Sequence, residues 1–293
     1  MPRTATGPAD TGAVLVTGCS SGIGHATALR LASRGHLVHA TARRPEALDD
    51  LAAAGCRILP LDVTDEASMR AAVAAVEAEH GRVGVLVNNA GWGQYGAIEE
   101  VDLDDVRRQF ETNVLGLARM CQLVLPAMRA AGRGRIINVS SMGGRLTFPG
   151  GGYYHASKHA VEALSDALRF EVAGFGVRVA VIEPGLIRTG FGDTAHETHP
   201  EPTGDSAYAG FTAASQAAIA SSYRGPLAGK PEAVARAVER AATAHRPRTR
   251  YQVTLGARLM ITARKWLPDV AWDAAMATAF PRPGAASKGE AKV

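Results

Sequence analysis

Tyr154 and Lys158 are the pair of residues whose types and spacing best suit proton transfer. Four positions apart on a helix, they project from nearly the same face, whereas the directions of Tyr153 and Lys158 differ by about 140°. A phenol titrates at about pH 10, and a neighbouring ammonium favours its phenolate form. We therefore expect Tyr154 to exchange a proton with a substrate oxygen and Lys158 to lower the pKa of Tyr154.

Ser141 is the second candidate for this chemistry, because it follows a β-branched run thirteen residues before Tyr154. Its hydroxyl can hydrogen-bond the same substrate oxygen and hold it at the proton donor, a positioning role. Ser140 points to the other face if the strand alternation continues. We therefore choose Ser141 over Ser140.

A glycine-rich turn, Thr17-Gly18-Cys19-Ser20-Ser21-Gly22-Ile23-Gly24, lies between an apolar run and a helical pattern. Gly18 and Gly22 allow a tight turn that approaches a pyrophosphate, and Gly24 allows close packing of the helix. Backbone N–H groups at such a helix start attract the negative charge. The predicted cofactor contacts in the turn are Gly18, Ser20, Ser21, Gly22, Ile23 and Gly24. The alternative is a glycine turn without a ligand.

Four motifs in this order resemble the short-chain dehydrogenase/reductase family over residues 12–189. Besides the glycine turn they are Asn88-Asn89-Ala90-Gly91, the Ser141 and Tyr154-x-x-x-Lys158 set, and Pro184-Gly185-Leu186-Ile187-Arg188-Thr189. The resemblance implies a nicotinamide cofactor, and an asparagine, Asn113, that holds a water linking the lysine to solvent. The cofactor contacts that it adds are Asp62, Val63, Asn89, Ala90, Gly91, Tyr154, Lys158, Pro184, Gly185, Ile187 and Thr189.

The residues after the second predicted strand indicate which cofactor the chain prefers. In a dinucleotide fold the end of this strand faces the adenosine ribose, and here it is Ala42, followed by Arg43 and Arg44. No carboxylate is present to repel a 2′-phosphate, and Arg43 offers a permanently charged fork. We expect NADP(H) in preference to NAD(H). The alternative is that both arginines are solvated loop charges.

Apolar residues close to these motifs are candidates for the walls of a substrate pocket or for ordinary core. They are Trp92, Leu146, Phe148 and Phe191. The tail around residues 264–269 resembles the branch of the family that contains retinol and 17β-hydroxysteroid dehydrogenases, which implies a bulky apolar substrate. The family resemblance also implies a homodimer or homotetramer formed through the helices of Asn113 and Lys158.

Together these features predict an NADP(H)-dependent oxidoreductase that interconverts a secondary alcohol and a ketone or aldehyde. One alternative is a relative that acts on another bond type, such as a carbon–carbon double bond or a sugar nucleotide. Another is a non-catalytic regulator that senses NADP(H). Complete Ser141, Tyr154 and Lys158 positions favour the enzyme.

Apolar β-branched runs that alternate with helical patterns predict an α/β fold, a doubly wound Rossmann-type parallel sheet. The expected strands are Ala13–Thr17, Leu37–Thr41, Arg57–Leu61, Val83–Val87, Arg135–Val139, Val177–Ile182 and Tyr251–Leu255. Helices are expected over residues 103–125, as one long helix, over 161–172 and over 232–244. We expect one domain over residues 12–280 with a mobile insert at about 190–228, between flexible ends 1–11 and 281–293.

Composition excludes several other classes of protein. The 293 residues are 46% hydrophobic with a net charge of +4, and no basic run predicts nucleic-acid binding. Three separated cysteines, Cys19, Cys56 and Cys121, fit a reducing, cytoplasmic compartment, and no membrane span is expected. His155 and His159 have a spacing that can bind metal, but no third ligand is evident, so we expect no metal site. His196 and His199 are interpreted as loop residues.

Overall fold

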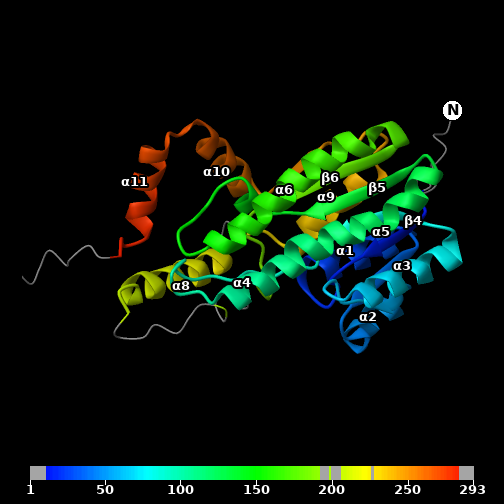
Figure 1. The fold of residues 1–293 in the computed structure, drawn as a ribbon, viewed down its shortest axis with the longest axis horizontal. Coiled ribbons are helices and arrows are strands. Elements are labelled where there is room, and N and C mark those ends of the chain that lie inside the picture. The colour runs from blue at the N-terminus through cyan, green and yellow to red at the C-terminus, as the bar shows by residue number, and fades with distance from the viewer. Residues whose placement is uncertain (1–10, 192–197, 199–205, 226–227, 284–293) are drawn as a thin grey trace, which may run out of the picture.

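The computed structural model describes residues 11–191, 198, 206–225 and 228–283. Within them, seven parallel strands form one sheet in the order β3-β2-β1-β4-β5-β6-β7 (Figure 1). The strands are β1 (Ala13–Val16), β2 (Val38–Ala42), β3 (Arg57–Pro60), β4 (Val83–Asn88), β5 (Gly134–Val139), β6 (Val177–Pro184) and β7 (Arg250–Val253). Each overlaps its predicted counterpart, and the predicted doubly wound α/β fold is confirmed.

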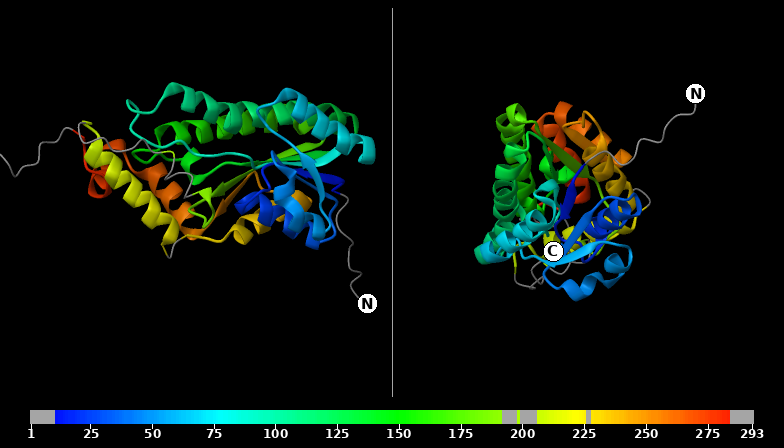
Figure 2. Two further views of the ribbon diagram at one scale, coloured as in Figure 1. Left: turned by 90° about the horizontal axis from the view of Figure 1, so that it is seen from below. Right: turned by 90° about the vertical axis from the view of Figure 1, so that its right-hand side faces the viewer.

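Helices cover both faces of the sheet, as Figure 2 shows. On one face lie α3 (Glu66–His80), α4 (Leu103–Phe110), α5 (Leu117–Ala130) and α6 (Gly152–Val172). On the other lie α1 (Gly22–Ser33), α2 (Asp49–Ala53) and α9 (Pro231–Thr243). Alternation along β1 divides its side chains between two cores: Val14 and Val16 face α1 and α9, whereas Leu15 faces α3 and α5.

The predicted helix over residues 103–125 is interrupted by a π-helical segment, Glu111–Gly116, between α4 and α5. A π-helical turn holds more residues than an α-helical one, and such segments are frequent at functional sites. The segment contains Asn113, and its last residue packs against the chain after β3. A Cβ on Gly116 would lie 2.3 Å from the Val63 carbonyl oxygen, so only glycine fits there.

Three helices extend the chain beyond the carboxyl ends of the strands: α8 (Ala209–Arg224), α10 (Leu255–Trp266) and α11 (Asp269–Ala279) (Figures 1 and 2). Helix α8 lies in the predicted insert, while His196 and His199 are outside the described residues. Leu255, predicted to end the last strand, instead begins α10. Thr254 causes this change, because it has φ +88° and its Oγ1 accepts a hydrogen bond from Ala257 N at 3.1 Å.

Several predictions concern the rest of the chain. The expected flexible ends, 1–11 and 281–293, lie outside the described residues except for Thr11 and residues 281–283. Cys19, Cys56 and Cys121 are buried free thiols. None of the helices in the described ranges has both the length and the apolar character needed to cross a membrane.

Candidate active site

A cavity of about 930 Å³ opens where the carboxyl ends of the strands meet. In a doubly wound fold this edge of the sheet is where ligands bind. Most of the predicted site residues line it, namely Gly18, Ser20, Ser21, Gly22, Ile23, Arg43, Asp62, Val63, Asn89, Ala90, Gly91, Trp92, Ser141, Tyr154, Lys158, Pro184, Gly185, Ile187, Thr189 and Phe191. Gly24 and Asn113 lie behind this lining and support it.

The glycine turn has the conformation that its sequence requires. Gly18 and Gly22 have φ of +72° and +59°, a region that side chains rarely adopt. A Cβ on Gly24 would lie 2.2 Å from the Gly18 carbonyl oxygen, so this position also needs glycine. The Ser21 side chain does not cap α1, and the N–H groups of its first turn remain available to an anion.

Asn89 fixes the turn to the end of β4. Its Nδ2 donates to the carbonyl oxygens of Thr17 and Gly18, both at 3.0 Å. Thr17 Oγ1 in turn accepts from the backbone N–H groups of Asn89 and Ala90, each at 3.0 Å. The two motifs, about seventy residues apart in the sequence, therefore form one rigid loop pair.

Ser141, Tyr154 and Lys158 come together at the other end of the cavity. Ser141 Oγ accepts from Gly143 N at 3.0 Å, and hydrogen bonding to Ser141 lowers the pKa of Tyr154. Lys158 Nζ donates to the Val139 carbonyl oxygen at 3.1 Å and lies 6.0 Å from the centre of the Tyr154 ring. The Lys158–Val139 hydrogen bond and the proximity of Ser141 to Tyr154 hold these two side chains of α6 against the end of β5.

The neighbouring residues of the same types point elsewhere. Tyr153 is half-buried, and its hydroxyl donates to the Ile98 carbonyl oxygen at 3.2 Å. Ser140 Oγ is buried without a partner among the described residues, and it lies with Glu162 beside Gly144. The geometry therefore agrees with the choice of Tyr154 and Ser141 over these neighbours.

Burial dominates the protonation of this group. It raises the pKa of Tyr154 to about 12, against the smaller lowering by the Ser141 hydrogen bond. It lowers the pKa of Lys158 to about 8, against the attraction of Glu162. The side chains by themselves therefore do not produce the expected lowering of the Tyr154 pKa. Tyr154 is a neutral phenol at neutral pH, which is the proton-donating form.

Asn113 is held by the loop after β4. Its Oδ1 accepts from Trp92 N at 3.0 Å, and its Nδ2 donates to Trp92 O at 2.8 Å and to Ser157 Oγ at 3.1 Å. A Cβ on Gly91 would lie 3.0 Å from Asn113 Oδ1 and 3.5 Å from Lys158 Nζ. Asn113 thus positions the loop beside Lys158, and its predicted part in a water relay stays a prediction.

The lining fits a nicotinamide dinucleotide from end to end. Arg43, with an exposed side chain, and Asp62 lie at the rim, the glycine turn follows, and Tyr154 is at the far end. The close approach at the turn leaves no room for larger residues: a Cβ on Gly18 would be 2.9 Å from Ala90 Cα, and one on Gly22 3.1 Å from Thr189 Cγ2. Glycines in this place leave the backbone accessible to a diphosphate.

Aromatic rings surround Tyr154, and two of them were not predicted from the sequence. Phe191, which was predicted, has its ring centre 5.3 Å from that of Tyr154. Tyr95 stacks on Tyr154, and Tyr223 from α8 packs against Phe191 with ring centres 6.2 Å apart. Tyr95 follows the Asn-Asn-Ala-Gly motif closely, which is a usable signal. No sequence signal points to Tyr223, because only the placement of α8 brings it next to Phe191.

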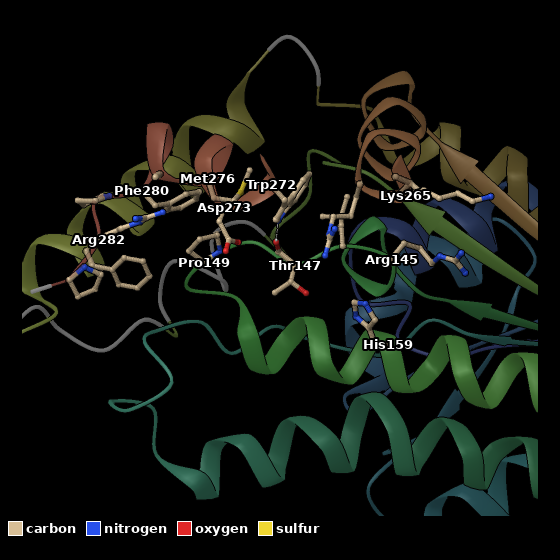
Figure 3. Close-up of a pocket in the computed structure, with 17 residues that line it drawn as sticks. Arg145, Thr147, Pro149, His159, Lys265, Trp272, Asp273, Met276, Phe280 and Arg282 are labelled. Carbon is tan, nitrogen blue, oxygen red and sulfur yellow. Dashed lines mark hydrogen bonds between the residues drawn. The ribbon is translucent and has the colours of Figure 1, made fainter. Parts of the chain in front are cut away.

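Leu146 and Phe148 are not part of this wall but belong to a hydrophobic cluster, the second of the two places predicted for them. They pack with Trp272 beneath α10 and α11, and Leu146 lines a second cavity there, shown in Figure 3. The sequence placed them near the site because they follow Ser141 closely. The 3₁₀ turn at Met142–Gly144 directs the chain away from Tyr154.

The His155 and His159 rings are engaged by the backbone. Nδ1 of His155 contacts the Gly143 carbonyl oxygen at 3.2 Å, and Nδ1 of His159 contacts the His155 carbonyl oxygen at 2.9 Å. Burial lowers the pKa of His155 to about 4. These contacts make both residues structural parts of α6.

Comparisons with known proteins agree with this site. The family model described as short chain dehydrogenase matches residues 12–200. A 3-ketodihydrosphingosine reductase of Bacteroides thetaiotaomicron is 46% identical over 180 residues, which are 61% of this chain and 65% of that relative. The match thus covers just under two thirds of that relative. Retinol dehydrogenase 5 of Homo sapiens is 35% identical over 297 residues, covering 95% of this chain and 92% of the relative.

Solved structures have the same fold. A short-chain dehydrogenase from Streptomyces avermitilis matches with a TM-score of 0.77 at 38% identity, covering 91% of this chain and 95% of that one. A short-chain dehydrogenase/reductase of Burkholderia phymatum in complex with NAD matches with a TM-score of 0.77 at 27% identity, covering 89% and 95%. A serine dehydrogenase complexed with NADP+ matches with a TM-score of 0.71 at 33% identity, covering 83% and 94%.

The fold and the site define a nicotinamide-dependent oxidoreductase of the Rossmann type. This chain belongs to the short-chain dehydrogenase/reductase family, and the predicted family membership is confirmed.

Proposed function

We propose that the chain is an NADP(H)-dependent oxidoreductase that interconverts an alcohol and the corresponding ketone or aldehyde, with secondary alcohols and ketones as the preferred pair. The observation that carries this proposal is the placement of Ser141, Tyr154 and Lys158 together in the cavity that the glycine turn also lines. A phenol, a hydroxyl and an ammonium suit a carbonyl oxygen that gains a proton.

In reduction, a nicotinamide cofactor bound along the glycine turn supplies the hydride. Ser141 then hydrogen-bonds the carbonyl oxygen of the substrate and holds it at Tyr154. The Tyr154 hydroxyl, neutral at pH 7, donates its proton to that oxygen. Lys158 stabilises the resulting phenolate with its ammonium charge. Oxidation uses the same groups in reverse.

The preference for NADP(H) rests on Arg43. Related structures contain NAD in one case and NADP+ in another, so membership of the family leaves the choice open. In this chain Ala42 stands at the end of β2 with the exposed Arg43 next to it on the rim of the cavity. Arg43 favours a 2′-phosphate, and no carboxylate at Ala42 repels it.

The substrate that we propose is bulky and apolar. Support comes from the rings of Tyr95, Phe191 and Tyr223 around Tyr154, and from Trp92 in the lining of the same cavity. The names of two relatives, a 3-ketodihydrosphingosine reductase and a retinol dehydrogenase, also state substrates of this kind.

The decisive experiment is a panel of ketones, aldehydes and alcohols assayed by nicotinamide absorbance with NADPH, NADH and their oxidised forms. We expect turnover of apolar ketones or secondary alcohols, faster with the phosphorylated cofactor. Tyr154→Phe should abolish turnover and leave cofactor affinity nearly unchanged. Cofactor binding without turnover of any compound would support the regulator, and turnover of enones or sugar nucleotides alone would support another bond type.

We also propose that the chain pairs through α5 and α6. Leu115, Leu164 and Phe170 are exposed on this side of the molecule at 53%, 41% and 87%. Light scattering tests it: Leu164→Lys should shift the particle mass to that of one chain, and an unchanged mass would exclude this interface.

A further inference from the structure

A second cavity, of about 1020 Å³, lies between the loop after β5 and the helices α10 and α11 (Figure 3). Its volume is at the upper end of the range for small-molecule sites, roughly 300–1,000 Å³. Among the described residues that line it are neither Tyr154, nor Lys158, nor any residue of the glycine turn. It is therefore a separate chamber from the candidate active site.

The two chambers are divided by a wall of rings. Phe148 packs against Trp272, which lines the second cavity, with ring centres 6.2 Å apart. Phe148 also packs against His155, with ring centres 5.8 Å apart, and His155 packs against Tyr154 at 5.5 Å. A molecule held in the second cavity is thus kept from the reacting group.

One part of the second cavity is apolar and elongated. Trp272 is only 7% exposed and forms the floor with Leu146 and Ile261. Met276 and Phe280 continue this surface along α11, and Figure 3 shows Trp272, Met276 and Phe280 following one another along the cavity. An apolar surface of this shape suits an extended alkyl chain.

The charges of the lining are unequal. Four cations line the cavity, Arg145, Arg264, Lys265 and Arg282, against one carboxylate, Asp273. Arg264 is paired with Asp269 at 2.6 Å and stacks over Trp272, and Arg145 lies 3.9 Å from Glu162. No ion pair is formed by Lys265 or Arg282 in the described parts of the chain. Figure 3 shows Arg145, Lys265 and His159 grouped at the opposite end from Phe280. That end suits an anionic group.

We propose that this second cavity binds a single-chain amphiphile with an anionic head group, a fatty acid or an alkyl phosphate, as a ligand that is not the substrate. The alkyl chain lies along Trp272, Met276 and Phe280, and the head group lies between Lys265 and Arg145. The proposal is independent of the reaction proposed above, because the ring wall separates the two sites.

Calorimetry on the full chain saturated with nicotinamide cofactor tests this proposal. Decanoate and decyl phosphate should each bind with one ligand per chain, and decanol should bind at least tenfold more weakly. Each further methylene in a series from eight to fourteen carbons should tighten binding roughly threefold to fourfold. The ratio of the carboxylate and phosphate affinities identifies which head group the site prefers. Equal affinity for decanol, or no dependence on chain length, would overturn the proposal.

Two matched pairs of variants locate the binding. Ala277 lines the cavity and Ala275, on the same helix, does not, and both are exposed. Ala277→Trp should abolish decanoate binding while Ala275→Trp leaves it unchanged. Lys265→Glu should weaken decanoate at least tenfold but leave decanol unaffected, and Arg258→Glu, outside the lining, should change neither. Binding that persists in Ala277→Trp would show that the amphiphile occupies another place, such as the candidate active site, and would refute the proposal.

Discussion

Tyr95 stacks on Tyr154, with ring centres 5.6 Å apart and an angle of 28° between the ring planes. Hydrogen bonding between the Tyr95 and Tyr223 side chains contributes to the raised pKa of Tyr95 and connects the loop after β4 to α8 beside Tyr154. Gly93 makes this packing possible, because a Cβ there would lie 2.7 Å from Tyr95 and 2.9 Å from Phe191. The orientation of the Tyr154 ring is thus set by side chains from three segments of the chain.

Tyr95→Ala should lower kcat/KM at least tenfold, because the Tyr154 ring loses the surface that holds it. Tyr95→Phe keeps the ring and loses only the bond to Tyr223, so its kcat should stay within about threefold. Adding Tyr223→Phe to Tyr95→Phe should lower kcat little further, since each substitution removes the same shared hydrogen bond. Steady-state kinetics measure these effects, and an unchanged cofactor affinity in each variant is the control. Full activity of Tyr95→Ala would contradict a role of Tyr95 in holding the Tyr154 ring.

The pH profile of the reductive reaction should reflect Lys158. Burial lowers its pKa to about 8, so the ammonium is present below that pH and is lost above it, while Tyr154, with a pKa of about 12, stays protonated. At saturating cofactor, kcat/KM should be level below about pH 8 and then fall as much as tenfold per pH unit.

Glu162→Gln provides the control for this assignment. The Glu162 carboxylate raises the pKa of Lys158 by attraction, so its removal should move the fall in activity to lower pH. A profile that stays level to pH 10, or a shift of the fall to higher pH in Glu162→Gln, would show that Lys158 does not set the profile.

Arg43→Ala should reduce the affinity for NADPH while leaving that for NADH nearly unchanged. A hydrogen bond to a charged group contributes about 1.5–3 kcal/mol, which corresponds to roughly 10- to 150-fold in the dissociation constant. Arg44→Ala is the matched control, since Arg44 is also exposed but does not line the cavity. Fluorescence titration measures both cofactors, and parallel losses for NADPH and NADH would mean that Arg43 does not contact the 2′-phosphate.

Arg250 holds three carboxylates together on the side of the sheet near α6. Its Nε lies 3.0 Å from Glu162 and 3.1 Å from Glu183, and its Nη2 lies 2.7 Å from Asp166. Arg250→Met leaves buried anions without a partner, so it should cost roughly 3–5 kcal/mol in the free energy of unfolding at pH 7. Urea unfolding measures this, with exposed Arg246→Met expected to change it by less than about 0.5 kcal/mol.

The pH dependence of this effect follows from Glu183. Burial raises the pKa of Glu183, so its contribution to stability is present below the ordinary carboxyl pKa and is lost as pH rises through the raised value. The cost of Arg250→Met should therefore be smaller at pH 4 than at pH 7. Adding Glu183→Gln should restore part of the stability at pH 7, and a cost that is equal at both pH values would contradict this explanation.

Features that depend on local sequence were predictable. The spacing of Gly18, Gly22 and Gly24 predicts a tight turn in which only glycine fits. The structure has a positive φ or a close backbone contact at each of these positions. The seven strands were predictable because buried parallel strands are short β-branched runs. The helical spacing of Tyr154 and Lys158 brought both to one cavity.

Features that depend on contacts between residues distant in sequence were not predictable. No pattern marks the π-helical segment around Asn113, which forms where Gly116 packs against Val63. Leu146 lies close to Ser141 in sequence but packs with Trp272, about 125 residues further along the chain. The pKa of Tyr154 is raised by burial, a property of everything packed around it.

The sequence by itself thus determined the fold and the glycine turn, and it singled out Ser141, Tyr154 and Lys158 as candidate reacting groups, because backbone conformation and side-chain spacing are local. Only the tertiary structure decided which rings surround Tyr154, which protons the buried groups hold at neutral pH, and that a second cavity lies behind Phe148. These depend on desolvation and on packing between helices far apart in the chain, which are set only when the whole chain has folded.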